Sequence, residues 1–120
     1  MTPFGARLRE LRARHDVTQG AMAEALGVSS AYLSALEHGR RGRPTFAFVQ
    51  RVIQHFNIIW DEADELARLA QVSHPRVVVD TAGLSPTATR LANVLAESVA
   101  QLDEDDLQDL LERVEAARRR

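Results

Sequence analysis

The sequence predicts an all-α protein in which a five-helix domain precedes a C-terminal helical hairpin. Apolar residues recur at helical spacing along most of the 120 residues. A serine, threonine or aspartate stands before each of these segments, where helix N-caps are found. Glycine or proline interrupts the pattern between segments, where helices end.

The five helices of the first domain are expected within residues 1–73. Glycine tolerates the left-handed backbone that often follows a helix. Gly27 and Gly39 are therefore expected just past the second and third helices. The expected N-caps are, in order, Thr2, Thr18, Ser29 or Ser30, Thr45 and Asp61.

Residues 74–120 follow a different pattern. Three successive valines favour a short strand at 77–80, although this segment could serve only as a stiff linker. Two amphipathic helices then begin near Ser85 and Asp103. Their apolar stripes cannot be buried in each other alone, so they must pack on the first domain or on a second chain.

We favour a second chain, because the first domain has five helices to build its own core. The C-terminal segment is therefore expected to hold a dimer together. The apolar residues expected at that interface are Val77, Val79, Leu91, Leu95, Val99, Leu102, Leu107, Leu110, Leu111 and Val114.

The net charge of −2 conceals a division along the chain. Residues 1–57 contain eight arginines against four acidic residues, whereas residues 58–120 contain seven arginines against thirteen. A basic half followed by an acidic half is expected if only the first half approaches phosphate groups.

Several functional classes are not expected. The absence of cysteine excludes disulfides and thiolate metal sites and fits a reducing cytoplasm. No apolar run is long enough for a membrane span, and charged residues occupy the place of a signal peptide's apolar core. The four histidines are widely spaced and no glycine-flanked serine elbow is present. We therefore expect no catalytic residue, metal or cofactor.

Residues 18–39 form the most informative segment, since they predict two short helices joined by a tight turn at Gly27. Counted from Gln19, the constrained positions hold a small, a flexible or an apolar residue: Met22, Ala23, Leu26, Gly27, Val28, Leu33 and Leu36. Small residues remain on the free face of the second helix, which suits a DNA major groove. They are Ser29, Ser30, Ala31 and Ser34.

On these residues the segment resembles the phage-repressor-like (Cro/C1-type, XRE) family of helix-turn-helix regulators. The resemblance covers about residues 4–71. It implies a lambda-repressor-like DNA-binding domain that works as a dimer on an inverted repeat. The matching residues are Leu8, Leu11, Thr18, Gln19, Ala23, Gly27, Val28, Ser29, Tyr32, Leu33, Ser34, Leu36, Glu37, Gly39, Arg40 and Arg41.

The resemblance also implies roles for individual residues. Ser29, Ser30, Ala31 and Ser34 would face base edges, although the serines could instead cap and solvate the helix. Contacts to phosphate are expected from Thr18, Gln19, Tyr32, Arg40, Arg41 and Arg43, of which Tyr32 could instead pack on its helix. Arg12 and Glu37 have the spacing of the family's ion pair between the first and third helices.

The expected function is a sequence-specific transcriptional regulator, a homodimeric repressor that binds double-stranded DNA in the cytoplasm, at the nucleoid. One alternative is an antitoxin that binds a toxin protein and represses its own operon; another protein partner would be an anti-repressor. A second alternative is a nucleoid-associated adaptor with little sequence preference. The serine and alanine face offers no bidentate base contact, so DNA shape would contribute to specificity.

Overall fold

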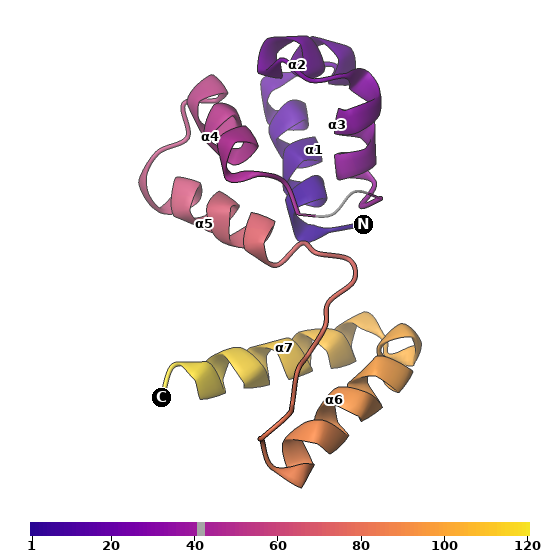
Figure 1. The fold of residues 1–120 in the computed structure, drawn as a ribbon. Coiled ribbons are helices and arrows are strands. Elements are labelled where there is room, and N and C mark those ends of the chain that lie inside the picture. Colours follow the sequence, from indigo (N-terminus) through magenta and orange to yellow (C-terminus); the bar gives the residue numbers. More distant parts are fainter. Residues whose placement is uncertain (41–42) are drawn as a thin grey trace. The chain divides into compact units, whose positions relative to one another are not determined.

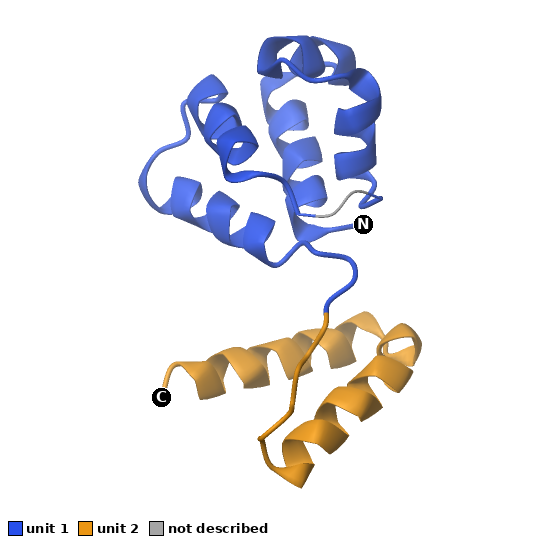
Figure 2. Ribbon diagram, in the orientation of Figure 1, with its two compact units in different colours: residues 1–77 blue, residues 78–120 orange. Residues whose placement is uncertain are grey.

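The computed structural model describes residues 1–40 and 43–120, and within these ranges every regular element is a helix (Figure 1). The all-α prediction is therefore confirmed. The elements are α1 (Pro3–His15), α2 (Gln19–Leu26), α3 (Ser30–Glu37), α4 (Phe46–His55), α5 (Trp60–Gln71), α6 (Pro86–Ser98), the short 3₁₀ helix η1 (Val99–Gln101) and α7 (Glu104–Arg118). The chain divides into two compact units, Met1–Val77 and Val78–Arg120 (Figure 2).

Side-chain caps fix the starts of most helices, at the residues expected from the sequence. Each cap oxygen accepts a hydrogen bond from the backbone N–H three residues later, which would otherwise lack a partner. In α3, Ser29 Oγ accepts from Tyr32 N at 3.0 Å. The other side-chain caps are Thr2, Thr18, Thr45, Ser85 and Asp103.

The start of α5 differs from the prediction that Asp61 caps it. The helix begins at Trp60, its N-cap position is Ile59, and no side chain caps it. Buried Ile58 anchors the preceding turn, and the chain then enters α5 through a left-handed Trp60 with φ of 56°. Asp61 therefore lies two residues after the N-cap position and instead contributes its charge to the first turn.

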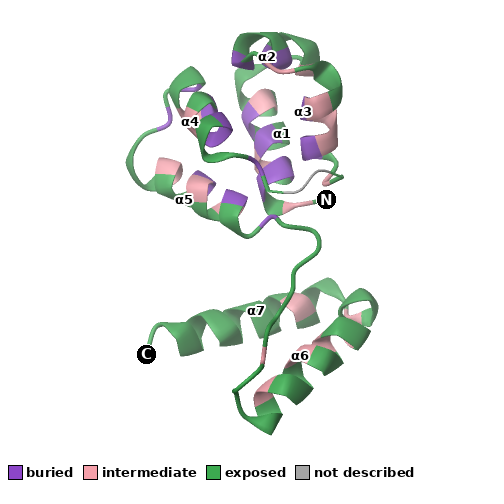
Figure 3. Ribbon diagram, in the orientation of Figure 1, coloured by how far each residue is buried: buried purple, intermediate pink, exposed green. Residues whose placement is uncertain are grey.

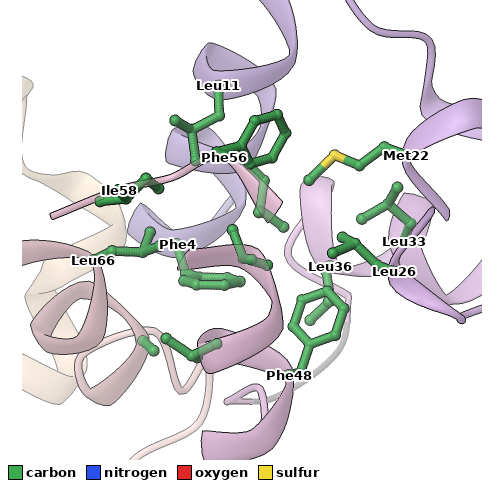
Figure 4. Close-up of a cluster of buried hydrophobic side chains, with 14 of the residues drawn as sticks. Phe4, Leu11, Met22, Leu26, Leu33, Leu36, Phe48, Phe56, Ile58 and Leu66 are labelled. Carbon is green, nitrogen blue, oxygen red and sulfur yellow. The ribbon is translucent and has the colours of Figure 1, made fainter. Parts of the chain in front are cut away.

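The hydrophobic core lies entirely in the first unit (Figures 3 and 4). The rings of Phe4 and Phe48 meet edge to face, with centroids 6.4 Å apart. Around them pack residues from all five helices of this unit and from the turn after α4, namely Leu8, Leu11, Met22, Ala23, Leu26, Leu33, Leu36, Val49, Val52, Phe56, Ile58, Leu66 and Ala70.

Gly5 permits the close approach of α1 and α3. A Cβ atom built at this position would clash with the carbonyl oxygen of Leu36 at the end of α3. The first helix can therefore support α3 only because residue 5 has no side chain.

Ser73 joins the end of this unit to its beginning. Its side chain is buried; Oγ accepts a hydrogen bond from Phe4 N at 2.9 Å and donates one to the Leu69 carbonyl at 2.5 Å. The hydroxyl thus satisfies an N–H in the first turn of α1 while closing the last turn of α5.

The second unit is a helical hairpin of α6, η1 and α7 in which no residue is buried (Figure 3). The first helix of the hairpin ends at Ser98, earlier than its apolar pattern suggested, so Val99 and Leu102 lie beyond α6. The two helices diverge from η1 (Figure 2).

The short strand considered at 77–80 does not form within the chain. These residues have no regular secondary structure, and Val78 is 92% exposed. A strand needs a neighbour with which to exchange backbone hydrogen bonds. The segment ends where Asp80 Oδ1 accepts a hydrogen bond from Ala82 N, an Asx turn that starts the approach to α6.

Candidate nucleic-acid interface

The α2–α3 turn has the backbone geometry that its glycine predicts. Gly27 has φ of 72° and ψ of 32°, and its N–H is shared between the carbonyls of Ala23 and Glu24. The next residue, Val28, donates to the Ala23 carbonyl at 3.0 Å. These bonds end α2 and let the chain enter α3 after one capping residue.

Arg51 from α4 also holds this turn. Its Nη1 donates to the Leu26 carbonyl at 2.8 Å, and its guanidinium carbon lies 5.9 Å from the centre of the Phe48 ring. The last turn of α2 contains no basic residue of its own. Arg51 therefore supplies both a donor for a terminal carbonyl and a cation at the negative end of the α2 dipole.

Sequence reasoning missed Arg51. Its partner is a backbone carbonyl 25 residues away, and such a contact leaves no spacing pattern in a single sequence. One sequence feature could have pointed to such a contact. The last turn of α2 contains no basic residue, so a cation from another element could interact with the C-terminal end of this helix.

The outer face of α3 carries the residues proposed to face bases. Ser30 and Ala31 are exposed, and Ser34 is half-buried. Ser29 is exposed as well, but its hydroxyl is engaged as the cap of α3. On the opposite side, Leu33 and Leu36 are buried in the core.

Ser34 has a neighbour that the sequence did not suggest. The Nδ1 atom of His38 lies 2.8 Å from the Ser34 carbonyl and 3.4 Å from its hydroxyl. One turn of helix separates the two residues, so the imidazole lies beside the C-terminal part of the exposed face.

The residues expected to contact phosphate lie on several elements. Thr18 is exposed and its hydroxyl caps α2, while Gln19 is half-buried at the first position of that helix. Arg40 and Arg43 are exposed in the connection between α3 and α4. Arg41 lies outside the described residues.

The ring of Tyr32 packs against α4, whereas the alternative considered from the sequence was packing on its own helix. The ring contacts Phe48 edge to face, with centroids 5.6 Å apart and planes at 80°. Phe48 therefore contacts both Tyr32 of α3 and the guanidinium of Arg51 on its own helix. This arrangement couples α3 to α4 through one aromatic ring.

The structure contains the ion pair predicted between Arg12 and Glu37. Arg12 Nη2 donates to Glu37 Oε1 at 2.8 Å and Nε donates to Oε2 at 2.9 Å, a bidentate geometry. A third bond, 3.3 Å long, runs from Nη1 to the Val17 carbonyl just before α2. Arg12 thus ties α1 to α3 and to the start of α2, and Glu37 is only 1% exposed.

The residues expected at a dimer interface lie in or next to the second unit, and most of them are exposed. Val77 and Val79 are 70% and 64% exposed in the linker. In the hairpin, Leu95, Leu102 and Leu107 are half-buried. The exposed members are Leu91, Val99, Leu110, Leu111 and Val114.

Residues 1–40 and 43–120 contain no group of three or more histidine, cysteine, aspartate or glutamate residues arranged to hold a metal ion. Within the same ranges, no helix is both long and apolar enough to cross a membrane.

Comparison with known proteins agrees with the α2–turn–α3 geometry. A family model described as a helix-turn-helix domain matches residues 3–69. The chain belongs to this helix-turn-helix family. The match confirms the resemblance to XRE-type regulators and runs from the start of α1 into α5, ending two residues before that helix does.

Two curated helix-turn-helix relatives come from Bacillus subtilis (strain 168). The uncharacterized HTH-type transcriptional regulator RghRB is 42% identical over 52 residues, which are 43% of this chain and 37% of that protein. The HTH-type transcriptional repressor RghR is 34% identical over 61 residues, or 51% of this chain and 45% of that protein. The chain therefore spans less than half the length of either relative.

Among solved structures, a chain described as SinR protein/SinI protein complex aligns with 98% of this helix-turn-helix protein and 99% of its own length. Its TM-score is 0.47 and the sequence identity is 17%.

Proposed function

We propose that this protein is a sequence-specific DNA-binding transcriptional regulator, a homodimeric repressor that acts in the cytoplasm on an inverted-repeat operator. The observation that carries the proposal is the α2–α3 unit. Its turn is fixed by Gly27 and Arg51, its inner side is buried, and small polar residues cover the exposed N-terminal part of α3. A helix of this size with such a face fits a major groove.

In this proposal α3 enters the major groove with Ser30, Ala31 and Ser34 toward the bases. A serine hydroxyl donates to or accepts from base edges, and the Ala31 methyl contacts a thymine methyl. Gln19 and the exposed arginines 40 and 43 engage phosphate on either side of the groove. With no bidentate reader on this face, the deformability of the operator supplies much of the discrimination.

The dimer is proposed to form through the second unit. Most of its large apolar residues are exposed within the chain, and burying them against a second copy would remove that surface from water. Two copies would then place their α3 helices about 34 Å apart, on half-sites one turn of DNA apart.

The test is selection of binding sites from random DNA, followed by mapping of bound sites in the native host. We expect an inverted repeat whose half-sites are about one helical turn apart. The ratio of specific to non-specific affinity should reach about 10³ or more. A ratio near one would contradict the proposal and favour the nucleoid-associated adaptor.

A second candidate is an antitoxin, favoured by one observation. Residues 78–120 combine exposed apolar residues with nine acidic residues against five arginines, a surface suited to a basic protein. Purification of the protein from its native host distinguishes the two candidates. A stoichiometric small basic partner would support the antitoxin, whereas a pure homodimer would support the repressor.

A further inference from the structure

The α7 helix carries an apolar stripe of which no residue is fully buried. Leu110, Leu111 and Val114 are 44%, 52% and 52% exposed, and Leu107 is half-buried. Leu107 lies three and four residues before Leu110 and Leu111, and these lie four and three residues before Val114, so the four side chains form one continuous stripe along the helix. This stripe is the central part of a longer face of α7.

The same face continues beyond the stripe at both ends, and there it is charged at its outermost positions. Steps of three and four lead backward from Leu107 to Asp103 and Glu104, and forward from Val114 to Ala117 and Arg118. The face therefore runs from acidic, through apolar, to basic.

The pattern has an internal symmetry about the middle of the helix. Reversing α7 about the point between Leu110 and Leu111 exchanges Leu107 with Val114, two apolar residues. The same reversal exchanges Asp103 with Arg118, two residues of opposite charge. A helix with this property is complementary to an antiparallel copy of itself.

We propose that the occupant of this face is α7 of a second copy, packed antiparallel across a two-fold axis near residues 110 and 111. The inference rests on the proposed homodimer and specifies its interface. A two-fold axis presents the same patch from both copies, so a self-complementary face is what such an interface requires. Asp103 of each copy then lies near Arg118 of the other.

A parallel pairing is disfavoured by the same charges. It would place Asp103 beside its own counterpart and Arg118 beside its own counterpart, and like charges across an interface are repulsive. Neighbouring residues strengthen the contrast, since Asp105 and Asp106 follow the acidic end and arginines 119 and 120 follow the basic end. Antiparallel packing also sets the two helix dipoles head to tail.

Cysteine cross-linking of the full-length chain without DNA tests the orientation, because the natural sequence has no cysteine. Glu104→Cys and Ala117→Cys lie about 20 Å apart along one helix, at a rise of about 1.5 Å per residue. A bis-maleimide shorter than this separation links them only if they meet across the interface. We expect cross-linked dimers when the two variants are mixed, and at most a tenth as much from either variant alone.

Leu111→Cys is the matched positive control, since it lies near the two-fold axis and cross-links with its own counterpart. The Glu104→Ser and Ala117→Ser variants are the negative controls. Circular dichroism shows whether substitution at these positions preserves the fold, and any cross-linking of these variants would be independent of a thiol. Cross-linking of Glu104→Cys alone and of Ala117→Cys alone would indicate a parallel pair and overturn the proposal. Failure of Leu111→Cys to cross-link would also overturn it, because the face would then not meet a second copy.

The proposed function as a DNA-binding regulator is tested separately, by measuring the affinity of the protein for the selected operator by fluorescence anisotropy. If the full-length protein forms the expected cross-links but binds the operator no better than other DNA, the proposed function is contradicted and the antiparallel pair stands. If it binds the operator specifically but does not form the expected cross-links, only the antiparallel pair is contradicted.

Discussion

At the scale of single residues, Glu37 is a nearly fully buried carboxylate whose partner, Arg12, reaches it from another helix. The spacing of this pair was predictable through the family resemblance. The contact of Arg51 with the Leu26 carbonyl was not, because backbone acceptors carry no residue identity. An ion pair between two side chains at a known spacing is thus easier to predict from sequence than a hydrogen bond from a side chain to a backbone carbonyl.

Arg12→Met is expected to destabilise the protein by about 3 kcal/mol, since it leaves the Glu37 charge buried without its partner. Urea denaturation followed by circular dichroism measures the change. Arg9→Met, at an exposed position of the same helix, is the control and should change stability by less than about 0.5 kcal/mol. Equal midpoints for the two variants would show that the ion pair does not support the fold.

Arg51→Met is expected to cost about 1 kcal/mol by removing the bond to the Leu26 carbonyl. It should also reduce operator affinity more than non-specific affinity, because α3 would be less firmly positioned. The slope of log affinity against log salt should be the same for this variant as for the unchanged protein, because Arg51 is not expected to contact phosphate directly. The control variant Arg51→Lys keeps the positive charge and a hydrogen-bond donor, so it should recover part of the operator affinity. A lower salt slope for Arg51→Met would contradict the role of Arg51 in positioning α3.

At the scale of elements, the helix starts were predictable where a side chain makes the cap. Thr18, Ser29 and Thr45 cap their helices as expected, because a local hydrogen bond decides these boundaries. The start of α5 was not predictable, since buried Ile58 and the left-handed backbone of Trp60 decide it. The boundaries that depend on tertiary packing are therefore the ones that sequence patterns miss.

The α1–α5 contact has a pH dependence that can be measured. Arg14 Nη2 donates to Glu62 Oε1 at 2.6 Å, and this bond lowers the pKa of the Glu62 carboxyl. A lowered carboxyl pKa stabilises the folded state above the ordinary value of about 4.3, and this stabilisation is lost as pH falls through the folded-state pKa. Both side chains are substantially exposed, so the effect on stability is small.

NMR titration of the Glu62 carboxylate should therefore give a midpoint below that of an ordinary glutamate. Arg14→Met is expected to raise this midpoint toward the ordinary value, and Arg9→Met to leave it nearly unchanged. An unaltered midpoint in Arg14→Met would mean that the pair does not form in solution.

At the scale of the whole molecule, the core and the exposed apolar residues belong to different units. All core residues lie between Phe4 and Ala70, whereas no residue of α6 or α7 is buried. The all-α fold and the order of helices were predictable from apolar periodicity. The partner of the hairpin was not, because an amphipathic stripe shows that a helix is covered without showing what covers it.

A chain ending at Val77 is therefore expected to keep its thermal unfolding midpoint within a few degrees of the full-length value. Its operator affinity should fall about 100-fold, because two half-sites are no longer bound by linked domains. Differential scanning calorimetry and fluorescence anisotropy measure the two quantities. A large drop in the unfolding midpoint would show that the hairpin supports the first unit.

The salt dependence of DNA binding should report the arginines between α3 and α4. Arg40→Gln and Arg43→Gln are each expected to lower the slope of log affinity against log salt by about one unit. Arg76→Gln, in the linker after α5 and beyond the residues that the family model matches, is a control that should leave the slope unchanged. An unaltered slope for both test variants would remove these arginines from the interface.

The bond between Ser73 and Phe4 has a consequence for how this protein can be rearranged. It places the first turn of α1 beside the residues that follow α5, so the two ends of the five-helix segment lie close together. A short bridge could join these ends, and new termini could be opened in an exposed connection away from α3. The same closure lets different C-terminal segments be joined to the unit at one point while its outer face on α3 stays undisturbed.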